Sequence, residues 1–240
     1  MNADVYSNEF LIGTTNLKVG DGGMGVLIGE LNTNQNYFDK VQKKIWKFWE
    51  TNNPNYEEWY SLKLNVQLEN GYFIYAEGGF TIDDIEDLKD EPKSIEIAGV
   101  DNNIILDYFQ HEPPRQFIKE PWEKITINQK LRYENELRIE LGVESQIPTL
   151  ERTRVFSFFK KKIKTHKLLN FECSALCKYQ CNDDILFTVR KKGIEKHFAV
   201  VHLTHKGKVE LPNFPTTQLF TDFEEFRKLR MEPDIEEWID

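Results

Sequence analysis

Residues 61–75 read SLKLNVQLENGYFIY, and this stretch decides the class of fold. Its first half alternates apolar and polar side chains, which is the period of a β-strand with one buried face. The pair Asn70-Gly71 follows and is typical of the two-residue turn of a β-hairpin. Such a turn would place Phe73 opposite Leu68 on the apolar face. The stretch therefore predicts an antiparallel hairpin.

Similar patterns on both sides of this hairpin predict further strands and helices. Strands bounded by turn residues are expected at residues 10–19, 26–31, 94–100, 104–109, 185–190 and 198–204. Helices are expected at residues 36–50, 82–88, 128–141 and 168–179. A last helix is expected to begin with a capping box of Thr221 and Glu224 and to end at Pro233. The sequence thus predicts an α+β fold of antiparallel sheets built from hairpins, with helices packed against them.

A break in these patterns indicates that the fold has two subdomains. Residues 143–150 show no periodicity, contain Pro148 and follow Gly142, a residue type common at helix C-termini. The local charge changes after this segment, because residues 152–167 include many lysines and arginines. We therefore expect an N-terminal α+β domain at residues 1–145 and a C-terminal α+β domain at residues 146–240.

Charge and composition limit the classes of function. The net charge of −9 disfavours nucleic-acid binding, which depends on Lys and Arg side chains that neutralise phosphates, and it favours a basic protein partner. The odd number of cysteines, three, indicates a reducing compartment. The sequence has no signal-peptide pattern at residues 1–11 and no uncharged apolar run of about 18 residues. We therefore expect a cytoplasmic protein without membrane association.

One glycine pattern resembles a nucleotide-binding fingerprint. Gly20, Gly22 and Gly25 match G-x-G-x-x-G, in which glycines let the backbone approach a pyrophosphate at a helix N-terminus. Residues 26–31 read as a strand, so no helix would point at the loop. A hairpin turn explains the glycines better. The serines and cysteines also lie outside known nucleophile motifs, and the sequence predicts no cofactor.

The cysteines and histidines do not have the spacing of a metal site. Three cysteines are spaced by four residues: Cys173, Cys177 and Cys181. On a helix the first and last would lie about 12 Å apart, too far for one zinc ion. His202 and His205 would face opposite sides of a strand, and His197 would lie about 26 Å from His205. The sequence therefore predicts no metal.

Acidic residues gather in two clusters that could form a docking surface for a basic protein. The first cluster contains Asp83, Asp84, Glu86, Asp87, Asp90 and Glu91. The second contains Glu232, Asp234, Glu236, Glu237 and Asp240. Most such clusters are solvated surfaces without a partner, and this is the alternative explanation. The basic, aromatic stretch at residues 152–167 could hold an anion or a nucleic acid, which the acidity of the chain disfavours.

Part of the C-terminal half resembles a bacterial family. The patterns that carry the resemblance are Ser174-Ala175-Leu176, Asp183-Asp184-Ile185-Leu186-Phe187, Val201-His202-Leu203-Thr204 with Gly207-Lys208, and Phe223-Glu224-Glu225-Phe226. In these patterns residues 174–240 resemble small bacterial proteins encoded beside secreted polymorphic toxins and regarded as candidate immunity proteins. The resemblance implies a cytoplasmic protein that binds and blocks a toxin domain, and it assigns no catalytic residue.

Three hypotheses follow from these observations. The first is an immunity-type protein that binds a cognate toxin, such as a basic nuclease, through acidic and aromatic side chains. The second is an enzyme whose carboxylates act on a small molecule, with a metal ion near residues 83–91 as an option. The third is a scaffold subunit that forms a homo-oligomer. The lack of a catalytic motif favours binding over catalysis.

Overall fold

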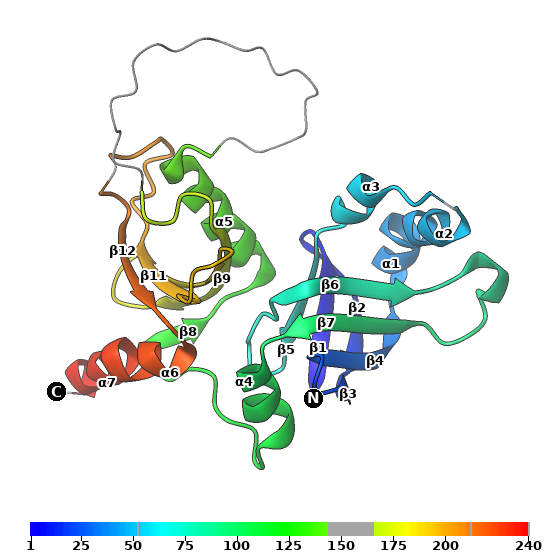
Figure 1. The fold of residues 1–240 in the computed structure, drawn as a ribbon, viewed down its shortest axis with the longest axis horizontal. Helices are drawn as coiled ribbons and strands as arrows, with labels where there is room; N and C mark the ends of the chain where they lie inside the picture. The colour runs from blue at the N-terminus through cyan, green and yellow to red at the C-terminus, as the bar shows by residue number, and fades with distance from the viewer. Residues whose placement is uncertain (52, 144–165, 212, 240) are drawn as a thin grey trace, which may run out of the picture. The chain divides into compact units, whose positions relative to one another are not determined.

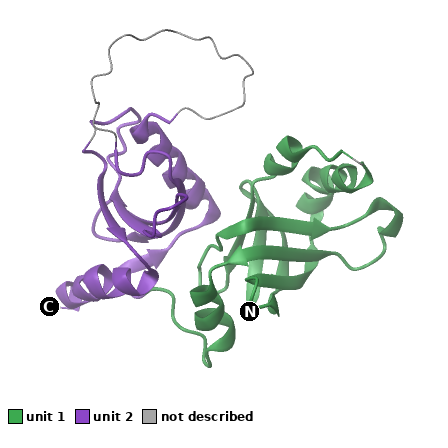
Figure 2. Cartoon of the chain, viewed as in Figure 1, with its two compact units in different colours: residues 1–118 green, residues 119–240 purple. Residues whose placement is uncertain are grey.

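The chain has an α+β fold in two compact units, Met1–Ile118 and Lys119–Asp240 (Figure 2). The computed structural model describes residues 1–51, 53–143, 166–211 and 213–239. Two antiparallel sheets and short helices confirm the predicted fold class. The units divide between Ile118 and Lys119 instead of at residues 145/146, because the helix that follows packs against a strand of the second unit.

Unit 1 contains an antiparallel sheet of seven strands (Figure 1). Six of them follow the order β5-β1-β2-β4-β7-β6, and the seventh, β3, pairs with β4 beside this row. The strands are β1 (Asn2–Ser7), β2 (Phe10–Asn16), β3 (Lys18–Asp21), β4 (Val26–Thr33), β5 (Leu64–Leu68), β6 (Ala76–Asp83) and β7 (Ser94–Val100). Alternate residues, among them Val5, Ile12 and Val66, are fully buried. The two ends of this order, β5 and β6, are edge strands.

The glycine-rich segment forms the predicted hairpin turn between β3 and β4. Asp21 fixes the turn, because its Oδ1 accepts hydrogen bonds from the backbone N–H groups of Gly23 and Met24 at 2.9 and 3.0 Å. Gly25 has a φ of +66°, and a Cβ there would lie 2.4 Å from the carbonyl oxygen of Val100. These glycines therefore serve chain reversal and close backbone approach.

The hairpin at residues 61–75 forms, but its register is one residue away from the prediction. Only Gly71 of the Asn70-Gly71 pair has a positive φ, +96°, whereas the two-residue turn needs both. The N–H of Gly71 donates to Leu68 O at 2.7 Å, which produces a three-residue loop. Phe73 consequently lies opposite Gln67 and not opposite Leu68.

The helices of unit 1 are shorter than the patterns predict. They are α1 (Gln35–Lys40), α2 (Gln42–Glu50), α3 (Tyr56–Tyr60) and α4 (Asn102–Ile105). The helix expected at 36–50 breaks at Val41, and Tyr37 is buried while the neighbouring Phe38 is exposed. The helix expected at 82–88 is reduced to one 3₁₀ turn over Glu86–Leu88.

The strand expected at 104–109 is wrong. Residues 102–110 form α4 and a π-helical turn over Leu106–Gln110. Asp101 begins the helix, because its side chain accepts from the N–H of Asn103 at 2.9 Å. A local cap therefore outweighs the β-branched residues that suggested a strand.

Unit 2 contains a five-stranded antiparallel sheet with the order β12-β11-β10-β9-β8 and a long helix, α5 (Ile127–Leu141). The strands are β8 (Trp122–Lys124), β9 (Glu172–Tyr179), β10 (Asp184–Arg190), β11 (Phe198–His202) and β12 (Thr216–Phe220). Helix α5 ends at Gly142 with a φ of +66°, as predicted, and it begins at a capping box of Thr126 and Gln129 that the sequence analysis did not identify. It packs against β9.

The helix expected at 168–179 is also wrong, because most of this segment is strand β9. Three consecutive residues, Ala175, Leu176 and Cys177, are fully buried, so both faces of the strand are covered. A strand buried on both faces lacks alternation, and its sequence pattern does not distinguish it from a buried helix. The predicted hairpin of β10 and β11 is confirmed.

The chain ends in α6 (Phe223–Phe226), a π-helical turn over Arg227–Met231 and α7 (Glu232–Ile239). The N-cap of α6 is Asp222, whose side chain accepts from Glu225 N, and not the expected Thr221. Pro233 does not end the helix: it lies in the first turn of α7, where its missing N–H is tolerated.

Candidate functional site

An aromatic hollow lies at the edge of the sheet of unit 1. It has a volume of about 460 Å³. Helices α2 and α3, the start of β5 and the middle of β6 line it through Phe48, Trp49, Tyr56, Trp59, Tyr60, Lys63, Leu64, Gly78, Gly79, Phe80 and Thr81. Because β5 and β6 are the two edges of one sheet, the sheet curls until both edges face the same hollow. Figure 1 shows α2 and α3 beside β6.

The aromatic side chains of the hollow contact one another and remain open to solvent. The ring centroid of Phe48 lies 5.4 Å from those of Trp49 and Tyr56 and 4.4 Å from that of Trp59. Tyr60 is 72% exposed, Tyr56 56% and Trp49 40%. Exposed apolar clusters of this kind mark interaction sites, and Trp and Tyr dominate the binding energy of protein interfaces.

Two glycines form the β6 side of the hollow. A Cβ at Gly78 would lie 2.8 Å from the Cβ of Ala98, so no side chain fits there. Gly79 has a φ of +87°, and a Cβ there would meet no atom within 4 Å. The backbone of β6 therefore packs closely against Ala98 at Gly78, and it is accessible to a ligand at Gly79.

Carboxylates surround the end of the hollow next to Trp49. The indole Nε1 of Trp49 donates to Ile82 O at 2.9 Å, which brings α2 to the end of β6. The next residue, Glu50, forms a side-chain hydrogen bond with Glu86, and this bond together with the nearby charge of Asp87 raises the pKa of Glu50. Carboxylates placed this close together attract a cationic group.

The first acidic cluster lies next to this end, with one exception. Asp83, Glu86, Asp87, Asp90 and Glu91 are exposed. The side chain of Asp84 is only 1% exposed and accepts hydrogen bonds from Tyr37 Oη at 2.6 Å and Gln42 Nε2 at 3.1 Å. Lys93 Nζ lies 3.8 Å from its other oxygen. Asp84 is therefore an internal residue and does not belong to the expected docking surface.

The second acidic cluster belongs to unit 2 and is only partly a surface. Asp234 is buried, and its Oδ2 accepts from Trp122 Nε1 and Arg230 Nε, both at 2.8 Å. Glu232 pairs with Arg227 at 2.5 Å. Glu236 and Glu237 are exposed, and Asp240 lies outside the described residues. The two clusters thus lie in different units.

A second hollow of about 400 Å³ lies on the sheet of unit 2. We call it the His202 hollow, and its lining consists of Asn182, Asp184, Val200, His202, Thr216, Thr217, Gln218 and Arg230. Asp184, His202 and Thr216 are direct neighbours across β10, β11 and β12. The Nδ1 of His202 lies 2.8 Å from Asp184 Oδ1, an arrangement that orients an imidazole for proton transfer. The strand pairing alone brings this pair together, and the sequence analysis missed it.

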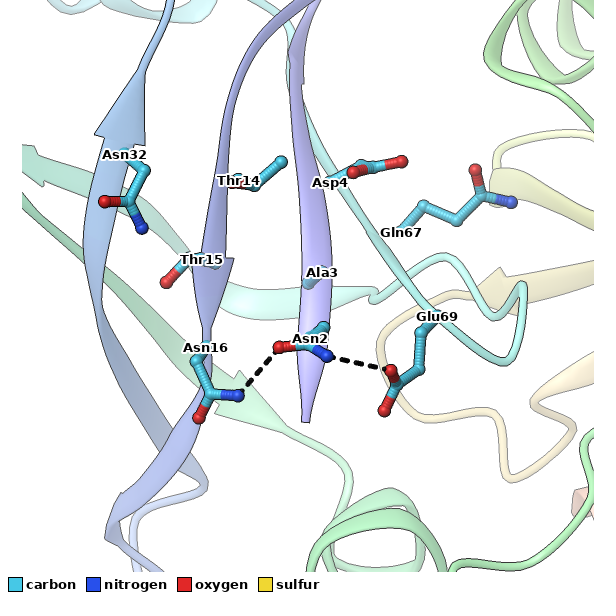
Figure 3. Close-up of a pocket in the computed structure, with 9 residues that line it drawn as sticks. All are labelled: Asn2, Ala3, Asp4, Thr14, Thr15, Asn16, Asn32, Gln67 and Glu69. Atoms are coloured by element: carbon cyan, nitrogen blue, oxygen red, sulfur yellow. Dashed lines mark hydrogen bonds between the residues drawn. The ribbon is translucent and has the colours of Figure 1, made fainter.

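A third hollow, shown in Figure 3, lies on the sheet of unit 1 and is lined mostly by polar residues, with Ala3 among them. Its side chains, Asn2, Asp4, Thr14, Asn16, Asn32, Gln67 and Glu69 among them, come from β1, β2, β4 and β5 and from the residue after β5. Asn2 accepts from Asn16 Nδ2 at 2.8 Å and donates to Glu69 at 3.1 Å. These bonds join three of the lining side chains, whereas the buried hydroxyl of Thr15, which also lines the hollow, has no hydrogen-bond partner among the described residues.

The cysteines and histidines stay apart within the described part of the chain, where no three metal-ligating side chains come together. Cys177 is fully buried, Cys173 is half-buried and Cys181 is exposed. Burial raises the pKa of Cys173 to about 12 and that of Cys177 well above its usual value, so both thiols stay protonated at neutral pH. Residues 152–165 of the basic stretch lie outside the described residues.

Comparisons with known proteins do not assign a function to any of these hollows. The chain matches no protein-family model, no curated protein and no solved structure. In the described residues no helix has the length and apolar character that crossing a membrane requires. The resemblance of residues 174–240 to immunity proteins stays a prediction.

Proposed function

We propose that this chain is a cytoplasmic immunity-type protein that binds a basic cognate toxin through the aromatic hollow and the carboxylates beside it. The cluster of mutually packed but exposed Trp and Tyr side chains is the single observation that carries the proposal. Aromatic anchors supply binding energy, and the exposed members of the first acidic cluster would attract a basic partner. The resemblance of residues 174–240 supplies the toxin as the class of partner.

The proposal predicts that Trp49→Ala and Tyr60→Ala each weaken binding of the toxin encoded beside this gene by about 30-fold or more. Tyr60 is largely exposed, so the fold should tolerate its removal, whereas Trp49 is 40% exposed and donates to Ile82 O, so the free energy of unfolding of Trp49→Ala is measured together with its affinity. Calorimetry with the purified toxin domain measures the affinity. Trp238→Ala is the matched control, because Trp238 is 50% exposed but lies in unit 2. Unchanged affinity in both hollow variants, or no complex with the wild type, would refute the proposal.

The His202 hollow favours a second candidate function, a hydrolase in which His202 is the general base. Asp184 holds Nδ1 and leaves Nε2 for a substrate, while Thr216 and Gln218 supply polar contacts. Screening the full chain against ester and phosphodiester substrates tests this candidate. We expect His202→Gln to reduce any activity found by about 100-fold or more, with His111→Gln as the control. Activity that survives His202→Gln would exclude this role.

A further inference from the structure

The chain between β5 and β6 first pairs with β5 and then leaves it. Leu68 N donates to Tyr72 O and Ile74 N donates to Val66 O, both at 2.9 Å. If this register continued, the start of β5 would lie opposite Ala76. Ala76 instead pairs with Val100 of β7, so the chain leaves β5 and follows the other side of the sheet. An open seam between β5 and β6 results, and the aromatic hollow lies on it.

The backbone of β6 directs hydrogen-bonding groups into this seam. The carbonyl of Ile82 points away from β7, because it accepts from Trp49 Nε1 at 2.9 Å. Backbone groups two residues apart in a strand point to the same side, so the N–H and C=O of Phe80 also face the seam. The neighbouring Gly78 and Gly79 carry no side chains, and a Cβ at Gly79 would meet no atom within 4 Å. An exposed edge of this kind is a template for another strand.

We propose that the seam takes up an extended basic segment of the partner protein, which pairs with Phe80 and adds a strand beside β6. This inference rests on the proposed function and specifies how the partner is held. The incoming backbone would bond to β6, alternate side chains would pack against Trp49 and Tyr60, and a basic side chain would reach Glu50 and Glu86. Charge complementarity selects a basic segment, since Glu50, Glu86 and Asp87 are exposed carboxylates that lie near one another at this end of the hollow.

The test uses the full chain and two synthetic nine-residue peptides of alternating lysine and valine, one of them N-methylated at alternate residues. Methylation keeps the charge and the side chains but removes the backbone donors. We expect the plain peptide to bind at least about tenfold more tightly and to slow hydrogen exchange of the Phe80 amide by about tenfold or more. Equal binding of the two peptides, or no binding of either, would overturn the proposal.

A pair of variants separates the backbone of Phe80 from its ring. Phe80→Pro removes the N–H that faces the seam and is tolerated because an edge strand does not use that N–H internally. Phe80→Ala removes the ring alone. We expect the proline variant to lose about tenfold more affinity for the plain peptide than the alanine variant. If both variants bind equally while Trp49→Ala still weakens toxin binding, the strand pairing is wrong and the proposed function stands.

Discussion

Replacing Arg230 by alanine is expected to lower the free energy of unfolding of unit 2 by about 3–5 kcal/mol. Arg230 donates from Nη2 to Asp184 and from Nε to Asp234, both at 2.8 Å. The carboxylate side chains are only 9% and 10% exposed, so the substitution would leave two buried charges without their cation. Breaking a buried ion pair from one side costs far more than the intact pair contributes.

Hydrogen exchange of the β10 amides measures this effect, with the β1 amides of unit 1 as an internal reference. Arg227→Ala is the matched control, because Arg227 pairs with the more exposed Glu224 and Glu232. Exposed pairs of this type contribute about 0–1 kcal/mol. Equal protection of β10 in the two variants would show that Asp184 and Asp234 do not depend on Arg230.

The same ion network shows why the acidic clusters were hard to interpret from sequence. Asp234 and Glu236 lie two residues apart in α7, yet one is buried under Trp122 and the other is exposed. Burial depends on which face of the helix meets the sheet, and that contact involves residues more than 100 positions away. Charge composition alone therefore predicts a surface where the structure has a buried network.

Short sequence patterns predicted the helix ends and hairpin turns that depend only on neighbouring residues. The helix formers of residues 128–141 and the glycine after Leu141 predicted α5 and its end, and both signals are local. The turns of β3–β4 and β10–β11 are equally local. Strand β9 was missed because its burial on both faces removes the alternation on which the prediction depends. The register of the hairpin at residues 61–75 depended on one backbone angle, that of Asn70, which its sequence does not specify.

The aromatic hollow was not predicted from the sequence for a different reason. Its residues come from four elements that only the curling of the sheet brings together. A sequence signal existed in residues 55–60, NYEEWY, where Asn55 caps a short helix through Glu57 and Glu58 and presents Tyr56, Trp59 and Tyr60. Aromatic density in a polar helix of five residues points to exposed rings, because so short a helix buries little.

Asp84→Ala is expected to destabilise unit 1 by about 2–4 kcal/mol, while Asp83→Ala, one residue earlier in the same acidic cluster, changes its stability by less than about 0.5 kcal/mol. Removing Asp84 leaves the hydroxyl of the fully buried Tyr37 without its acceptor at 2.6 Å and Lys93 without its carboxylate. Asp83 is exposed, so its loss removes only a solvated charge.

Hydrogen exchange of the β1 amides measures both variants, with the β10 amides of unit 2 as the reference. Tyr37→Phe distinguishes the two parts of the effect, because it removes the hydroxyl and its need for an acceptor while leaving Asp84 and Lys93 in place. Asp84→Ala should cost much less in the Tyr37→Phe background, since the orphaned hydroxyl is then absent. If Asp83→Ala proves as costly as Asp84→Ala, the cluster acts as one unit and Asp84 has no distinct internal role.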